Sequence, residues 1–394
     1  MRVLHTSDWH IGRTFHGYAT LDAVRDVLSV IPGIVRDQGV DVVIVAGDIY
    51  DLTNPSADAV SVLQETLVAI LNAGAKVILT SGNHDSAIRL GFAGPFTAAF
   101  GLHFVTNAGD IGTPIEIADE YGAVDFYGIP YLQPELVRQL PWVPSDARSQ
   151  REVIDAAVGV IRDSITERKS EGRRSVLVAH TFVAGAEAES SESERAITKA
   201  PLVSGGVDAV PVSAFDGVDY AALGHIHGRA QLAKHVRYSG AVLHYSFKEA
   251  GKPRGGWLVD LGTSGVEQIE WVDLPIPRPL KEVRGTFNDL LTDAQWEPFV
   301  DHYIRGVYTD KSKEIEPLQR LRARFEYCAE VVHDPSDREM GPTSTYAERV
   351  KGKTDPQVAE SFLVDVRNGE GPSVAEEKLI AQVIAERAAE VLVG

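Results

Sequence analysis

Short apolar runs alternate with amphipathic stretches along the N-terminal part of the chain. The runs at residues 2–6, 40–46 and 75–80 predict buried strands. Residues 20–37 and 56–72 carry apolar positions at helical spacing, and Pro32 is expected to interrupt the first helix. This β-α-β-α-β order predicts a largely parallel sheet covered by helices.

The alternation continues with shorter elements further along the chain. Strands are expected at residues 125–129, 175–179, 219–223 and 256–261, and a helix at residues 151–169. Residues 184–195 are small, acidic and rich in serine, which predicts a loop.

Three prolines, Pro275, Pro277 and Pro279, indicate a domain boundary, because proline stiffens linkers and cannot donate to a strand ladder. Beyond them we predict a small α/β domain. Its expected elements are strands at 281–284 and 303–307 and a helix at 318–331.

The last part of the chain predicts a linker followed by a helix. Residues 341–356 are polar and contain glycine and proline. Ser373 and Glu376 have capping-box spacing ahead of an amphipathic stretch. We therefore divide the chain into residues 1–273, 274–340 and 341–394.

Side chains that can bind metals follow five of the predicted strands. Residues two apart in extended chain point the same way, so Asp8 and His10 are expected to converge. The carboxyl ends of parallel strands form the edge at which ligands bind. Imidazole, carboxylate and amide donors without thiolate suit manganese, iron or zinc. Eight such groups are too many for one ion and predict a two-metal site bridged by Asp48: Asp8, His10, Asp48, Asn83, His84, His180, His225 and His227.

A pair of metal ions about 4 Å apart suits phosphoryl transfer, because the ions lower the pKa of a shared water and neutralise negative charge on the attacking and leaving oxygens. Such a site needs no serine or cysteine nucleophile. His84, if it is not a ligand, is placed to protonate the leaving oxygen or to stabilise the charge that develops.

The cysteine count, the apolar runs and the net charge exclude several classes of protein. The chain has 394 residues, a formal net charge of -18 and one cysteine, Cys328, which excludes an internal disulfide and a cysteine zinc site. The sequence shows no membrane-length apolar run and no signal peptide, so we expect a cytoplasmic protein. The acidic charge argues against a generally basic nucleic-acid binder, although local cations can still attract phosphate.

The strand-end motifs resemble those of the calcineurin-like metallophosphoesterases. The resembling segments are Asp8-x-His10, Gly47-Asp48, Gly82-Asn83-His84-Asp85, His180 and Gly224-His225-x-His227. The resemblance implies an α/β sandwich of β-sheets flanked by helices, followed by a small capping domain that binds DNA. It also implies one metal on Asp8, His10, Asp48 and His227 and a second on Asp48, Asn83, His180 and His225. It also implies that His84 is the catalytic histidine and that Asp85 orients it.

Further stretches resemble the SbcD-type branch of this superfamily, the nuclease subunits of bacterial SbcC–SbcD complexes. They are residues 191–197 with 205–211 and 219–225, residues 238–240 with 246–249, and residues 274–286. This resemblance implies a manganese-dependent double-strand exonuclease and single-strand or hairpin endonuclease that acts in DNA repair, recombination and replication. It further implies a homodimer bound to an SMC-type ATPase through its C-terminal helices, with two Mn²⁺ ions per subunit.

Two positions differ from relatives of the branch, and several cations are candidates for DNA contacts. Asp51 stands where archaeal and eukaryotic relatives carry a histidine, although an acidic residue is typical of the bacterial branch, and Ala241 replaces a serine. A small-molecule phosphodiesterase or phosphatase of the same superfamily is the alternative, and a non-catalytic scaffold is disfavoured because every ligand is present. The candidate DNA-binding residues are Arg13, Arg89, Lys248, Lys252 and Arg254.

Overall fold

The N-terminal apolar runs form neighbouring strands of a six-stranded mixed sheet in the computed structural model. The strand order is β14-β13-β1-β4-β5-β6. Strands β1, β4, β5 and β6 run parallel, and the β13–β14 hairpin adds an antiparallel edge. The bounds are β1 Arg2–Thr6, β4 Val42–Ala46, β5 Lys76–Thr80, β6 Leu102–Val105, β13 Gly255–Gly262 and β14 Gly265–Asp273.

A second six-stranded sheet has the order β11-β12-β10-β9-β8-β7. Strands β8, β9, β10 and β12 run parallel to one another, whereas β7 and β11 pair antiparallel at the two edges. The bounds are β7 Ile115–Asp119, β8 Gly122–Ile129, β9 Arg174–His180, β10 Tyr220–Gly224, β11 Ala230–Gln231 and β12 Val236–Tyr238. A small hairpin, β2 Thr14–Phe15 with β3 Tyr18–Ala19, lies apart from both sheets.

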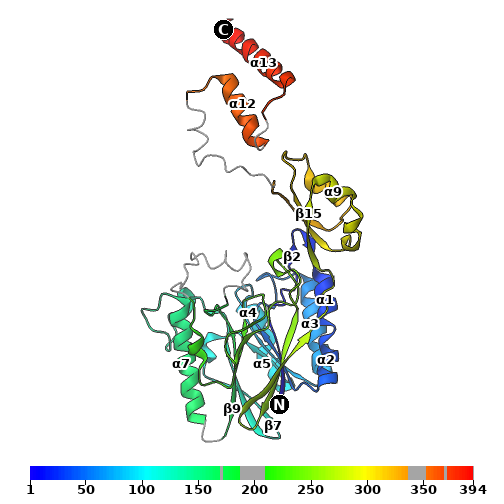
Figure 1. Ribbon diagram of the computed structural model, residues 1–394. Coiled ribbons are helices and arrows are strands. Elements are labelled where there is room, and N and C mark those ends of the chain that lie inside the picture. The colour runs from blue at the N-terminus through cyan, green and yellow to red at the C-terminus, as the bar shows by residue number, and fades with distance from the viewer. Residues whose placement is uncertain (169–171, 187–208, 336–351, 368–370, 394) are drawn as a thin grey trace. The chain divides into compact units, whose positions relative to one another are not determined.

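The two sheets pack face to face with helices on both outer sides (Figure 1). In β4, Val43 and Val45 join the core beneath the helices, while Val42 and Ile44 join the core between the sheets. The helix α7 Gln150–Arg168 covers the second sheet, to which it contributes buried residues such as Ile154. The predicted α/β sandwich of sheets flanked by helices is confirmed.

The helices of the first outer layer begin and end where local sequence dictates. The predicted helix 20–37 is divided into α1 Leu21–Leu28 and α2 Ile31–Gln38, with Pro32 in the first turn of α2. The helix α3 Ala57–Asn72 is capped by Ser56, whose hydroxyl accepts the backbone N–H of Ala59. Short helices complete this unit: α4 Ala87–Leu90, η1 Gly91–Ala93, α5 Gly94–Thr97, η2 Ala98–Phe100, η3 Ala108–Asp110, α6 Pro134–Val137, η6 Val212–Phe215 and η7 Phe247–Glu249.

The structure describes residues 1–168, 172–186, 209–335, 352–367 and 371–393, and contacts divide the chain into Met1–Pro279 and Leu280–Gly394. The family-like stretch 191–197, residues 205–208 and most of the predicted loop 184–195 lie outside the described residues.

The C-terminal unit contains a parallel sheet of β15 Leu280–Gly285, β16 Tyr303–Tyr308 and β17 Cys328–His333. The predicted helix 318–331 is wrong beyond its first turns. The helix α10 Pro317–Arg322 ends early, and Val331 and Val332, which favour extended chain, pair with β16. The remaining helices of this unit are α9 Phe287–Thr292, η8 Ala294–Phe299, α12 Asp355–Val366 and α13 Val374–Val393.

Candidate metal centre

The predicted metal-binding residues follow strands whose carboxyl ends lie together. Strands β1, β4 and β5 are parallel neighbours in one sheet, and β9 and β10 are parallel neighbours in the other. Strand β4 also packs against β9 and β10 across the sandwich. The loops that leave these strands therefore meet at one edge of the two sheets.

The backbone at this edge is strained. Asp8, His10, Asp48 and His225 have positive φ angles of 51°, 44°, 50° and 106°, which residues other than glycine rarely adopt. Our explanation for the convergence of Asp8 and His10 was wrong, because β1 ends at Thr6 and neither residue is extended. Backbone bonds to the loop after β4 hold both in place: the N–H of Asp8 donates to Gly47 and that of His10 to Asp48, each at 3.0 Å.

Two glycines allow the loops to approach closely. A Cβ on Gly47, whose φ is +81°, would overlap the ring of His180. A Cβ on Gly224 would overlap the carbonyl oxygen of Ala46. That carbonyl is the group to which His180 Nδ1 hydrogen-bonds at 2.9 Å, so the glycines and the histidine are packed as one unit.

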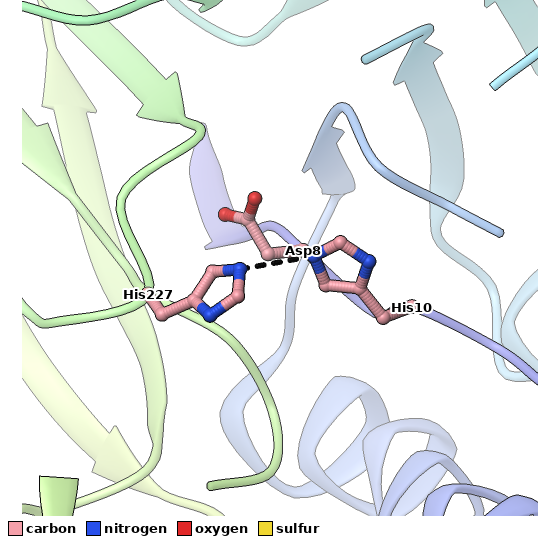
Figure 2. A group of neighbouring side chains, drawn as sticks. All are labelled: Asp8, His10 and His227. Atoms are coloured by element: carbon pink, nitrogen blue, oxygen red, sulfur yellow. Dashed lines mark hydrogen bonds between the residues drawn. The ribbon is translucent and has the colours of Figure 1, made fainter. Parts of the chain in front are cut away.

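One group of donors is formed by Asp8, His10 and His227, whose donor atoms lie within 4.8 Å of one another. Figure 2 shows the rings of His10 and His227 facing each other beside Asp8. Nε2 of His10 lies 3.0 Å from Nε2 of His227. Nε2 of His10 also lies 3.6 Å from Oδ2 of Asp48. All four side chains are buried, so a cation between them would be shielded from water.

A second group of donors surrounds the other side of Asp48. Nε2 of His180 lies 3.3 Å from Oδ2 of Asp48 and 3.0 Å from Oδ1 of Asn83. Nδ1 of His225 lies 3.1 Å from the same Asn83 oxygen. Asp48 thus contacts histidines of both groups, as a bridging ligand must.

Burial keeps three of the histidines neutral. It lowers the pKa of His10 to about 4 and that of His225 to about 3, and it holds the pKa of His227 well below its ordinary value. A neutral imidazole has a free lone pair on one nitrogen, which is the form that binds metal. The donor chemistry therefore fits divalent cations.

The two buried carboxylates favour positive charge at the same place. Burial and the charge of nearby Asp48 raise the pKa of Asp8 to about 7. For His180, burial disfavours the charged ring, but the Asp48 carboxylate outweighs it and raises the pKa to about 9. Burial alone would raise the pKa of Asp48, yet the His180 charge holds it well below its usual range. The Asp48 carboxylate therefore stays charged and favours a positive charge beside it, which the His180 ring carries here and which a metal ion would also carry.

His84 lies at the half-exposed margin of the group, with its ring centroid 4.9 Å from that of His10. Its Nδ1 hydrogen-bonds to the carbonyl oxygen of Asp51 at 2.8 Å, which leaves Nε2 for a ligand. Asp85, which we expected to orient His84, instead accepts the backbone N–H groups of Ile49, Tyr50 and Gly82. It joins the β4 and β5 loops, and the contact that positions the His84 ring comes from Asp51.

Sequence reasoning missed Asp51 and Glu249 as members of the site. Oδ1 of Asp51 lies 3.4 Å from Nδ1 of His10 and 3.6 Å from Nδ1 of His84. Glu249 is buried, and its Oε1 lies 3.8 Å from Nδ1 of His227. Asp51 could have been found from its position, three residues after Asp48 on the same loop. For Glu249 the one signal was that it lies in the stretch 246–249, which resembles the SbcD-type branch.

The candidate DNA-binding cations occupy different environments. Arg254 is only 2% exposed and binds Glu249, so its assignment to a DNA-facing rim is wrong. The guanidinium of Arg13 lies 4.5 Å from the ring centroid of Tyr245, close to His10. Arg89 and Lys248 are exposed and Lys252 is half-buried, so these three remain on the surface.

Comparison with known families assigns the chain. The sequence model of the calcineurin-like phosphoesterase family matches residues 1–229, which include every donor described above. The chain belongs to the calcineurin-like phosphoesterase family. Its members use divalent metals and hydrolyse phosphoesters, and the clustered donors here are of the type such metals bind.

The solved structures found to be similar to this calcineurin-like phosphoesterase have low sequence identity and low TM-scores. A Thermus thermophilus protein, TT1561, is 12% identical with a TM-score of 0.38, over 69% of this chain and 98% of its own. A dimetal phosphatase from Danio rerio is 14% identical with a TM-score of 0.41, over 70% and 98%. GAP50 of Plasmodium, described as the anchor in the inner membrane complex, is 10% identical with a TM-score of 0.33, over 87% and 99%. With TM-scores this low, the family assignment rests on the family model alone.

Among the described residues of this calcineurin-like phosphoesterase, the helices are too short or too polar to cross a membrane.

Proposed function

We propose that the protein is a manganese-dependent DNA nuclease of the SbcD type, with double-strand exonuclease and single-strand or hairpin endonuclease activity. The observation that carries the proposal is the convergence of seven buried or half-buried metal donors beside His84. The branch-like segments 238–240 and 246–249 support DNA as substrate, as does a second unit after Pro279.

The chain's own residues define the chemistry. Two bound Mn²⁺ ions would supply an acidified water and neutralise phosphate oxygens. Asp48 contacts histidines of both donor groups. The loops that carry Asp8, His10 and His225 hold these residues in their positive-φ conformations and so fix the positions of their side chains. The Asp51 carbonyl oxygen accepts Nδ1–H of His84 and fixes the ring, so Nε2–H of the imidazolium form can be given to the leaving oxygen, which leaves the ring neutral.

The partner in this proposal is an SbcC-like SMC-type ATPase in the cytoplasm, at the nucleoid. The C-terminal helices α12 and α13 support it, because Phe362, Leu379 and Val383 are more than half exposed there. An apolar helix face of this kind suits a hydrophobic groove on a partner.

A homodimer belongs to the same proposal. Residues 87–100, which carry α4 to η2, expose the large side chains Ile88, Phe92, Phe96 and Phe100. Beside them lies a cavity of about 480 Å³ lined by apolar residues of α3. Extended apolar surface of this kind marks an interaction site.

A small-molecule phosphodiesterase or phosphatase is the alternative within the family. The net charge of -18 favours it, because a polyanionic substrate is repelled by an acidic protein. The burial of Arg254 favours it too, since one candidate contact for DNA phosphate is lost.

Cleavage of a labelled hairpin-ended duplex tests the proposal, with Mn²⁺, Mg²⁺ and chelator arms. Bis-p-nitrophenyl phosphate is run in parallel as a small diester. We expect Mn²⁺-dependent hydrolysis of both. His84→Gln should lower the rate about 10²- to 10⁴-fold, because the proton donor is lost while the metal donors remain.

Separate outcomes decide between the alternatives. Hydrolysis of the small diester alone, with and without a purified SbcC-like ATPase, would contradict the nuclease and favour the small-molecule enzyme. Full activity of a folded His84→Gln protein would remove the role assigned to His84.

A further inference from the structure

A buried ion pair lies beside His227, on the side of the ring opposite the metal donors. Nε2 of His227 lies 3.0 Å from Nε2 of His10, whereas its Nδ1 lies 3.8 Å from Oε1 of Glu249. The side chains of Glu249 and of its partner Arg254 are 3% and 1% exposed. The Glu249 carboxylate and the Arg254 guanidinium are thus shielded from water next to His227, one of the metal donors.

The position of this carboxylate is fixed by two bonds to its other oxygen. Oε2 of Glu249 accepts the Arg254 guanidinium at 2.5 Å and the backbone N–H of Tyr245 at 2.9 Å. Arg254 also donates to the carbonyl oxygen of His227, so it is tied to the same residue. Glu249, Arg254 and the backbone of His227 therefore form one connected group.

The remaining oxygen of Glu249, Oε1, lies 3.8 Å from Nδ1 of His227. Oε1 is buried without a hydrogen-bond partner among the residues that the structure describes. A neutral imidazole has a single N–H, and a carboxylate beside Nδ1 favours the proton there. The lone pair is then on Nε2, the nitrogen that faces His10 and the metal donors.

We propose that Glu249 is a positioning residue that sets the tautomer and direction of His227 and so strengthens metal binding. The inference rests on the proposed two-metal function and adds to it a role for a residue outside the ligand set. At 3.8 Å, Oε1 of Glu249 and Nδ1 of His227 are beyond hydrogen-bond distance, so the carboxylate acts on the ring through its charge. A carboxylate that accepts the second ring N–H of a histidine ligand directly is worth about 10- to 100-fold in metal affinity, and we expect the lower end of that range here.

Calorimetric titration of the metal-free full-length protein with Mn²⁺ tests the inference without relying on activity. Glu249→Gln keeps the shape of the side chain and removes its charge. We expect the wild type to bind two ions, and the variant to bind one of them about 10-fold more weakly. Asp119→Asn is the matched control, because it removes the carboxylate of another ion pair, with buried Arg174, outside the donor groups. It should leave both affinities unchanged.

A purely structural role for the ion pair predicts a different result. It would lower the thermal stability of Glu249→Gln while the folded protein kept wild-type Mn²⁺ affinity, and that outcome overturns the inference. Should the single variant not fold, the double variant Glu249→Gln/Arg254→Met removes the pair together and should show the same loss of affinity. A wild type that binds no Mn²⁺ would overturn the metal centre itself, so the two failures are distinguishable.

Discussion

At the scale of single residues, a buried histidine away from the metal donors makes the fold sensitive to acid. His5 lies inside the sandwich, with Nδ1 2.8 Å from the hydroxyl of Tyr220 and Nε2 3.1 Å from the carbonyl oxygen of Leu223. Burial lowers the pKa of His5 from 6.5 to about 3. The neutral ring satisfies both partners, with Nε2–H donating to the carbonyl and Nδ1 accepting from the tyrosine.

The lowered pKa of His5 determines whether the free energy of unfolding rises or falls with pH. Between its ordinary pKa and about 3, the unfolded chain binds a proton on His5 that the folded chain does not, so stability falls as the pH falls through this window. His5→Gln should therefore lose less free energy of unfolding than the wild type, by up to about 2 kcal/mol, between about pH 7 and pH 5. Urea unfolding at both pH values measures it. Equal losses in the two proteins would contradict the assignment.

Residue identities were easier to predict from the sequence than residue environments. The donors follow predictable strands, so their types and approximate location could be predicted. The positive φ angles of Asp8 and Asp48 could not, because contacts between loops far apart in sequence impose them. For the same reason Arg254 and Asp85 were given the wrong partners: a charged residue in a loop carries no local sign of burial.

At the scale of elements, the ends of β4 and β10 are in such close contact that one methyl group should disturb both. A Cβ at Gly224 would overlap the carbonyl oxygen of Ala46 and displace the hydrogen bond from His180. We expect Gly224→Ala to lower the free energy of unfolding by about 1–3 kcal/mol, as overpacking does. It should also weaken Mn²⁺ binding.

A glycine in an open position provides the control for this prediction. A Cβ at Gly159, inside α7, meets no atom within 4 Å, so Gly159→Ala should be neutral or stabilising by up to about 1 kcal/mol. Denaturant unfolding of both variants makes the comparison. If Gly224→Ala were as stable as Gly159→Ala, the packing between the strand ends would be looser than described.

Elements with continuous local patterns were predictable, and those defined by distant pairing were not. The apolar runs of β1, β4 and β5 needed only their own sequence. The stretch that became α10 and β17 carries Leu318, Leu321 and Phe325 at helical spacing, which favoured one long helix. The helix ends at Arg322, and residues from Cys328 onward are extended because β17 pairs with β16, a contact between strands that are separate in the sequence.

At the scale of the whole molecule, the segment 87–100 exposes several large apolar side chains that the described part of the chain does not cover. Ile88, Phe92 and Phe100 are 88%, 78% and 80% exposed, and the rings of Phe92 and Phe96 lie 6.4 Å apart. The neighbouring face of α3 adds exposed Val60 and Val68 along the cavity. Isolated exposed apolar residues need no explanation, but a contiguous group of aromatic ones does.

The homodimer we propose would cover this surface, and charge placed in it should prevent association. Phe92→Glu/Phe96→Glu leaves the fold intact, because both side chains are mainly in solvent, but it places two carboxylates in a desolvated interface. We expect light scattering after size-exclusion chromatography to give a dimer for the wild type and a monomer for the variant. Leu136→Glu, at a 74% exposed position of α6, is the matched control and should remain dimeric. A variant that stays dimeric would move the interface elsewhere, and a monomeric wild type would leave the exposed phenylalanines to bind another protein.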